Sequence, residues 1–430
     1  MIKKYIKVLI RDDMGDYSSN YSKIVFGMPT QILWGFIAIA IFMTGDGIEV
    51  AFLSKYLVHH LGFRPDQAAM VFTIYGATSA ISSWFSGVLA EVYTPRKLMI
   101  VGALWWILFH ALFMIFGIHS SNYFMILLFY GIRGFAYPMF FYGFFVWVVQ
   151  KTPPHRLASA VGWIWSMFTI GYGIVSSFLA SFAIVALGFE TTLWLSILFV
   201  AAGGLIIFFC IKKTPEDTSK KYTLFSEKLK EMSKGVTLIY RNKNIFMALI
   251  IRIICNLSLF GFPVIMPLFY TSGTVGFKTS QWLLIWGIVF VIQPFSNVIW
   301  GAIGDRIGWM FQMRWFGFVG CGLATLSFYY LPYFFGNNFL IAAIAALFFG
   351  LTVTSFVPMG AIFPMIEPEH KGAAVSVQNL GGGLANFMGP ALATLLLPSA
   401  GIKGVVICYA VLYFFAAFLT LFIKVNQPKG

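Results

Sequence analysis

The feature that most constrains this chain is a series of apolar stretches, each long enough to cross a lipid bilayer as a helix. Such a helix needs roughly 20 predominantly apolar residues. Hydrophobic residues make up 59% of the 430 residues and charged residues only 10%, whereas soluble domains carry about 25% charged residues. The sequence therefore predicts an all-α membrane protein with twelve transmembrane helices. The twelve stretches lie at about 31–57, 67–90, 97–118, 122–149, 158–186, 190–211, 245–271, 280–303, 311–331, 339–363, 371–397 and 403–424.

The formal net charge of +14 is distributed very unevenly along this pattern. If the N-terminus is cytoplasmic, 23 of the 29 Lys and Arg residues fall on the cytoplasmic side. This asymmetry follows the positive-inside rule. It predicts a multi-pass protein of a bacterial inner membrane with both termini in the cytoplasm, and it argues against a nucleic-acid partner. The remaining six basic residues are Arg64, Lys278 and Lys403 in outer loops and Lys55, Arg133 and Arg252 within spans.

A long polar segment divides the spans into two sets of six. We expect two pseudo-symmetric six-helix bundles, each built from one copy of a repeat. The predicted divisions are a cytoplasmic arm at 1–30, an N-terminal bundle at 31–211, a linker at 212–244, a C-terminal bundle at 245–424 and a tail at 425–430.

Two pairs of matching segments indicate the repeat. "GVLAEVYTPRK" begins at Gly87 and "GAIGDRIGWM" begins at Gly301, and the pairs Pro138–Met139 and Pro358–Met359 lie in the fourth and tenth spans. The matches come at nearly the same separation in the sequence. Two unrelated bundles with chance matches are the alternative.

The paired loops resemble the signature motif of the major facilitator superfamily, G-x-x-x-D-R-x-G. Glycines allow close helix packing, and charged side chains can bind the ends of neighbouring helices. The first copy departs from the pattern, because Glu91 replaces the usual Asp, and "TP" stands where the turn glycine is expected. We therefore expect a cytoplasmic gate, with simple positive-inside anchoring as the alternative. The gate candidates are Gly87, Glu91, Arg96, Gly301, Asp305 and Arg306.

At finer detail the chain resembles the polyol permease family of this superfamily, which includes ribitol and D-arabinitol permeases. The strings "FMTGDGIEVAFLS", "LLFYGIRGFAYP", "RIICNLSLFGFPVIMP", "FSNVIWG", "MRWFGFVG", "FVPMGAIFPMIEPEHKGAAVSVQNL" and "VNQP" carry the resemblance. It covers nearly the whole chain. It implies the twelve-helix fold of the superfamily and import driven by protons.

Charged residues inside the spans are candidates for function, because they are expensive in a bilayer. Asp46 and Glu49 lie three residues apart in the first span, Arg133 lies in the fourth span and Arg252 in the seventh. In sugar-type members of the superfamily, an acid on the first helix facing an arginine on the fourth is linked to proton coupling. The resemblance therefore implies that Asp46 pairs with Arg133 and carries the proton. Static ion pairs that fix helix packing are the alternative for both arginines.

Glu49 is then a second proton site or a ligand for solute hydroxyls. Amide side chains also suit a neutral polyol, since they both donate and accept hydrogen bonds. His110 is a lone histidine among aromatic residues, and we interpret it as packed or at the lipid interface. The predicted solute-binding residues are Glu49, Tyr137, Arg252, Asn256, Gln293, Asn297, Asn379 and Asn386.

No enzyme motif is apparent: there is no nucleotide-binding loop, and the four cysteines have no metal-ligand spacing. We predict a monomeric secondary transporter without a cofactor, which imports a small polyhydroxylated solute together with protons by alternating access. Import of an organic anion such as a hydroxycarboxylate or carboxylate siderophore, with Arg133 and Arg252 as clamps, is the alternative. Export and a non-transporting membrane sensor are the other possibilities.

Overall fold

The computed structural model describes residues 24–25, 28–152, 157–211, 237–369 and 371–425. Most of the predicted arm and linker lie outside these residues. A short antiparallel ladder pairs Ile24 with Pro29 and Val25 with Met28, and the other described elements are helical. The first half contains β1 (Ile24–Val25), β2 (Met28–Pro29), η1 (Thr30–Ile32), α2 (Leu33–Gly47), α3 (Leu53–His59), α4 (Pro65–Tyr93), α5 (Pro95–Leu112), η2 (Phe113–Ile118), α6 (Tyr123–Arg133), α7 (Ala136–Lys151), α8 (Leu157–Phe168), η4 (Thr169–Val175), α9 (Ser176–Leu187) and α10 (Phe189–Cys210).

The second half repeats this pattern of long, interrupted helices. It contains α12 (Lys243–Ile254), α13 (Leu257–Tyr270), α14 (Thr279–Val291), α15 (Gln293–Ile307), α16 (Trp309–Gln312), η6 (Met313–Val319), α17 (Gly320–Phe335), α18 (Phe339–Val353), η7 (Thr354–Phe356), α19 (Met359–Ile366) and α20 (Lys371–Leu419).

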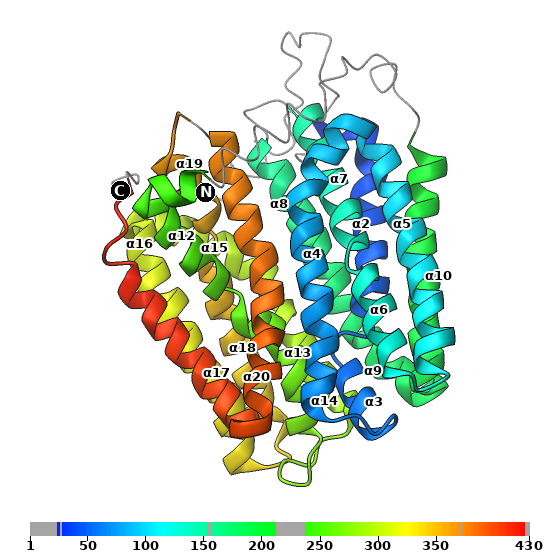
Figure 1. The fold of residues 1–430 in the computed structure, drawn as a ribbon. Coiled ribbons are helices and arrows are strands. Elements are labelled where there is room, and N and C mark those ends of the chain that lie inside the picture. The colour runs from blue at the N-terminus through cyan, green and yellow to red at the C-terminus, as the bar shows by residue number, and fades with distance from the viewer. Residues whose placement is uncertain (1–23, 26–27, 153–156, 212–236, 370, 426–430) are drawn as a thin grey trace.

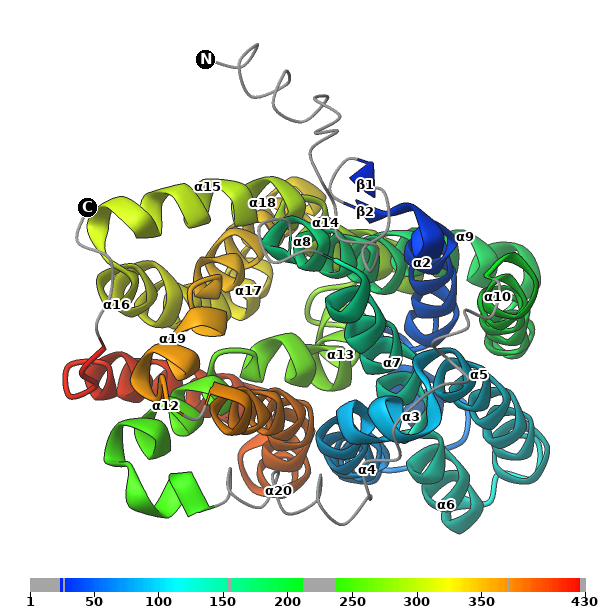
Figure 2. The same cartoon turned by 90° about the horizontal axis from the view of Figure 1, so that it is seen from above.

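The two halves of the chain gather on opposite sides of the molecule (Figure 1). The view from above shows the same division, with α4 lying beside α20 where the halves meet (Figure 2). Within the first half α2 packs against α10 and α5 against α7, and within the second half α17 packs against α18. The helical fold predicted from the sequence is confirmed.

Ten helical stretches of the described chain are long and apolar enough to cross a membrane. One of them, Ala373–Leu419, covers both of the last two predicted spans and is interrupted at Gly401, whose φ is 61°. Another predicted span, the 29-residue α4, is not among the ten. This helix is rich in hydroxyl residues, and these bind neighbouring backbone: Thr78 donates to the Gly131 carbonyl at 2.6 Å and Ser82 to the Phe135 carbonyl at 2.7 Å.

The two loops with matching sequences also match in conformation. Thr94 has φ 91° and ψ 137°, and Gly308 has φ 92° and ψ 136°. A non-glycine residue seldom adopts positive φ. Thr94 therefore takes the conformation that glycine supplies in the second loop, which agrees with the expectation that both loops descend from one repeat.

The halves contact one another strongly at one end of the molecule. We call this the distal end, defined by residues 60–64 between α3 and α4. Ser54 of α3 donates to the Pro263 carbonyl at 3.2 Å, Lys55 donates to the Thr279 hydroxyl at 2.7 Å, and Ser181 of α9 donates to the Ser280 carbonyl at 2.9 Å. Each of these contacts joins the first half to the second, so the described structure is closed at the distal end.

Candidate functional site

Glu49 lies in a break in the first membrane-crossing segment. α2 ends at Gly47 and α3 begins only at Leu53. Between them the helical hydrogen bonds give way to turns, for example from the Phe52 amide to the Glu49 carbonyl at 3.0 Å. Breaks of this kind expose backbone and re-aim side chains, as in the discontinuous helices of transporters.

Two glycines hold the neighbouring acid, Asp46, in the last turn of α2. A Cβ on Gly45 would lie 2.6 Å from the Ser196 carbonyl oxygen, and a Cβ on Gly47 would lie 2.5 Å from that of Tyr172. Any larger residue would push α2 away from α10 and η4. The two glycines of "TGDG" therefore allow α2, which carries Asp46, to pack closely against α10 and η4.

Arg133 is the last residue of α6 and forms a buried ion pair with Glu49. Its exposed fraction is 1% and that of Glu49 is 0%. The chain turns after Arg133 at Gly134, where a Cβ would clash with the Thr78 hydroxyl of α4. The break between α6 and α7 thus brings the guanidinium to the break between α2 and α3.

His110 of α5 completes this pair. Its Nε2 lies 3.0 Å from the Leu193 carbonyl oxygen and its Nδ1 lies 2.5 Å from Arg133 Nη1. A carbonyl only accepts and a guanidinium only donates, so Nε2 carries the hydrogen and Nδ1 is the acceptor. The neutral histidine therefore holds Arg133, and its Nδ1 lies 3.7 Å from Glu49 Oε2.

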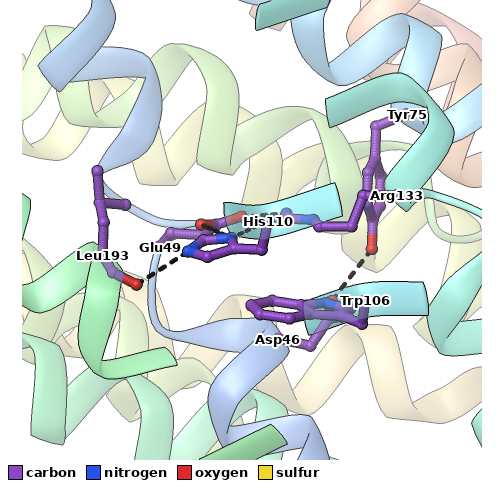
Figure 3. Close-up of polar contacts among 7 residues, drawn as sticks. All are labelled: Asp46, Glu49, Tyr75, Trp106, His110, Arg133 and Leu193. Atoms are coloured by element: carbon purple, nitrogen blue, oxygen red, sulfur yellow. Dashed lines mark hydrogen bonds and ion pairs between the residues drawn. The ribbon is translucent and has the colours of Figure 1, made fainter. Parts of the chain in front are cut away.

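Asp46 has a different set of partners (Figure 3). Its Oδ1 accepts from the Trp106 indole at 2.7 Å and from the Tyr75 hydroxyl at 3.2 Å. The Arg133 guanidinium carbon lies 4.6 Å from the centre of the Trp106 ring and 4.3 Å from that of Tyr130. Trp106 thus contacts both the arginine and the second acid.

The expected pairing of Arg133 with Asp46 is not what the structure contains. Arg133 pairs with Glu49, because the helix breaks between the two acids and no longer presents them on one regular face. Asp46 receives only neutral donors among the described residues. His110 is packed, as expected, but it is also a member of the polar cluster. A lone histidine in an apolar span was the signal for this role.

Arg252 of α12 is the second arginine predicted for the site, and it lies against α20. A Cβ on Gly382 of α20 would lie 2.8 Å from Arg252 Nη2. The absence of a side chain at Gly382 therefore leaves room for the guanidinium. Nη1 donates to the Cys255 sulfur at 3.0 Å, and the buried Nε has no partner among the described atoms. The described ion pairs include none of Arg252.

The predicted amide and tyrosine ligands lie on several helices of both halves. Tyr137 of α7 stacks on Tyr75, with ring centres 6.5 Å apart. Asn386 of α20 donates to the Ser79 hydroxyl of α4 at 3.3 Å, across the contact between the halves. The buried Gln293 Nε2 lacks a described partner. Three further candidates are half-buried, without a described side-chain hydrogen bond: Asn256, Asn297 and Asn379.

The gate candidates are only partly described. Arg96 donates from Nη2 to the Phe208 carbonyl at 2.6 Å and from Nε to the Ile211 carbonyl at 3.1 Å, so it binds the end of α10. No described atom lies within 4 Å of a would-be Cβ on Gly301, and Arg306 is exposed. The described residues therefore make no close helix contact at Gly301. The side-chain surroundings of three other candidates lie outside the described structure, namely Gly87, Glu91 and Asp305.

Comparison with known proteins identifies the family of this chain. The family model of the Major Facilitator Superfamily matches residues 35–363. The chain is 48% identical to the D-arabinitol transporter of Klebsiella pneumoniae over 404 residues, and 48% identical to its ribitol transporter over 403 residues, with 94% of both chains covered in each case. It is also 40% identical to the alpha-ketoglutarate permease of Bacillus subtilis (strain 168), over 94% of this chain and 91% of the relative.

The fold has solved counterparts as well. The crystal structure of the nucleoside transporter NupG matches with a TM-score of 0.71 at 12% identity, over 92% of this chain and 99% of the other. Helical architecture, family model and full-length relatives all agree. The chain therefore belongs to the major facilitator superfamily, in the branch of the D-arabinitol and ribitol transporters, and is a membrane transporter rather than an enzyme.

Proposed function

We propose that the protein imports a small sugar alcohol together with a proton across a bacterial inner membrane. One observation carries the proposal: the first half buries two acids, Asp46 and Glu49, against a single arginine and a neutral histidine. With both acids ionised the cluster would hold one uncompensated negative charge, and a buried charge without a partner is costly. Binding one proton removes that charge.

Asp46 is our choice for the acid that binds the proton. Glu49 already has Arg133 as its cation, whereas the described partners of Asp46 are neutral. Trp106 contacts both Arg133 and Asp46, so a short movement of the guanidinium would bring it to Asp46. An adjacent arginine favours an ionised acid. In this scheme the approach of Arg133 releases the proton, and its return to Glu49 lets Asp46 bind another.

The solute would lie between the halves. Tyr137 on the first half and Arg252 on the second are proposed ligands, with Asn256, Gln293, Asn297, Asn379 and Asn386 as further hydrogen-bonding groups. The unpartnered Arg252 Nε and Gln293 Nε2 support this assignment, because buried donors in native proteins are nearly always satisfied. Glu49 is less suited to bind solute while Arg133 occupies it.

Alternating access would follow from the two halves rocking about this site. We propose twelve spans in two six-helix bundles, 31–211 and 245–424. To the ten candidate spans this adds α4, and it counts α20 as two spans separated at Gly401. Both termini would be cytoplasmic. The distal end is then the outer side, closed in this structure, and the loops at Gly87–Arg96 and Gly301–Arg306 form the inner gate. The protein would act as a monomer.

An organic anion is the second candidate solute. It is favoured by Arg252, which has no acid within ion-pair distance among the described residues, and by the similarity to an alpha-ketoglutarate permease. Uptake of D-arabinitol, ribitol and alpha-ketoglutarate into proteoliposomes, with and without a pH gradient, separates the two.

Asp46→Asn tests the coupling. We expect the variant to lose pH-driven accumulation but to keep counterflow exchange, because exchange needs no net movement of protons. Both are measured in the same vesicles. Ser327→Ala is the control, because the Ser327 hydroxyl of the second half donates to the Leu323 carbonyl of its own helix, outside the proposed site. Full accumulation by Asp46→Asn would refute the assignment.

A further inference from the structure

The break that carries Glu49 is completed by a side chain from the other half. The carbonyl oxygen of Ala51 accepts a hydrogen bond from the indole of Trp282, on α14, at 2.6 Å. Among the described backbone hydrogen bonds none reaches this carbonyl. Ala51 and Trp282 are both buried. In a continuous helix the carbonyl would be bound by an amide one turn later, and here Trp282 takes that place.

The Trp282 indole packs among aromatic side chains. Its ring centre lies 4.8 Å from that of Tyr270, 5.8 Å from that of Trp286 and 6.2 Å from that of Phe328. All three belong to the second half. The position of the indole is therefore set by the second half, and the bond to Ala51 transmits that position to the first.

Neighbouring contacts place this bond within the distal closure. Ser54 and Lys55 follow Ala51 in the chain and bind Pro263 and Thr279 of the second half. The contacts of Ser54 and Lys55 lie in α3, beyond the break. The Trp282 bond lies inside the break, because Ala51 is two residues from Glu49. Opening of the distal end would remove the donor from a buried carbonyl, and buried carbonyls need a partner.

We propose that Trp282 is a positioning residue that couples closure of the distal end to the Glu49–Arg133 pair. When the halves meet, the indole fixes the turn at residues 48–52 and so places the Glu49 carboxylate against Arg133. When they separate, the turn relaxes and the pair loosens, which frees Arg133 to move. The inference rests on the proposed proton coupling and assigns the element that links this coupling to the movement of the halves.

Trp282→Phe tests the inference, because phenylalanine keeps the aromatic packing and removes the donor. Trp286→Phe is the matched control: Trp286 lies one turn further along α14, and its indole makes no described hydrogen bond to the first half. We expect Trp282→Phe to lower the ratio of pH-driven accumulation to counterflow about tenfold, the change produced by losing ~1.4 kcal/mol. Trp286→Phe should leave the ratio unchanged.

A second measurement does not depend on transport. Dicyclohexylcarbodiimide modifies protonated carboxyl groups in apolar surroundings, and the modified residue is identified by mass spectrometry of peptides. We expect faster modification of Glu49 in Trp282→Phe than in the wild type, and the wild-type rate in Trp286→Phe.

The outcomes separate the two proposals. Equal ratios and equal Glu49 modification in Trp282→Phe and Trp286→Phe would overturn the role of Trp282 and leave proton coupling intact. Wild-type protein that shows counterflow but no accumulation in a pH gradient would overturn the coupling itself, and the inference with it.

Discussion

The α2–α3 segment of the first half and the α12–α13 segment of the second are broken at similar places, yet the two breaks contain different side chains. In the first half the break between α2 and α3 contains Glu49, which is bound by the charged Arg133 and approached by His110 of α5. In the second half the break between α12 and α13 contains no acid: its Cys255 sulfur accepts from the Arg252 guanidinium at 3.0 Å, and neutral groups make the neighbouring contacts. Ser258 and Thr325 of α17 share a hydroxyl hydrogen bond of 2.9 Å.

Tyr413 of α20 is one of these neutral groups: its hydroxyl accepts from the Ser258 amide at 3.1 Å and donates to the Cys255 carbonyl at 3.5 Å. The two halves nonetheless share another feature, an arginine that binds the end of a long helix. Arg96 binds the last carbonyls of α10, and Arg314 binds the Thr420 carbonyl and hydroxyl just beyond α20. The comparison teaches that the two halves share broken helices and arginine anchors, whereas the described buried ion pair lies in the first half.

The largest expected effect comes from removing the charge from the first break. Glu49→Gln leaves Arg133 buried without a carboxylate, and breaking a buried pair costs ~3–5 kcal/mol. Thermal unfolding of the purified protein in detergent should show a large loss of stability. Asp46→Asn is the control, because its partners are neutral donors, and we expect a much smaller loss. Equal losses in the two variants would contradict the assignment of Glu49 as the acid paired with Arg133.

A smaller effect is expected at the cation of the second half. Arg252→Gln removes a guanidinium that has no described acid partner, so it should not destabilise the protein as the loss of a paired arginine would. Binding of an anionic solute should weaken tenfold or more, since a hydrogen bond to a charged group contributes ~1.5–3 kcal/mol. Binding of a sugar alcohol should weaken only modestly. Calorimetric titration with alpha-ketoglutarate and D-arabinitol measures both, and unchanged affinity for each would remove Arg252 from the solute site.

The smallest effect is expected at a neutral hydrogen bond beside the break in the second half. Ser258→Ala removes one hydroxyl from its bond with Thr325, and a neutral hydrogen bond contributes about 0.5–1.5 kcal/mol. Ser327→Ala is a suitable control on α17, because the Ser327 hydroxyl makes an exposed bond to the Leu323 carbonyl of its own helix. Thermal unfolding should rank Glu49→Gln well above Ser258→Ala, and Ser258→Ala above Ser327→Ala. The reverse ranking would show that charge does not distinguish the two breaks.

Much of the architecture could be predicted from the sequence because a bilayer imposes simple rules. Apolar length predicted the helices. The matching loops predicted a repeat, and in the structure their residues Thr94 and Gly308 have nearly the same φ and ψ. The same reasoning singled out Asp46, Glu49, Arg133 and Arg252, because a charge in an apolar span is costly wherever it lies. These conclusions depend on composition and order along the chain alone.

The pairing of those charges was decided only by the tertiary structure. Residue spacing predicted Asp46 and Glu49 on one helical face, but the helix breaks between them, and Glu49 is the acid that pairs with Arg133. His110 and Trp282 lie far from Glu49 in sequence, and no local pattern connects them to it. A break removes the regular periodicity on which sequence reasoning relies, so the partners of a broken helix are determined by the helices that pack around it.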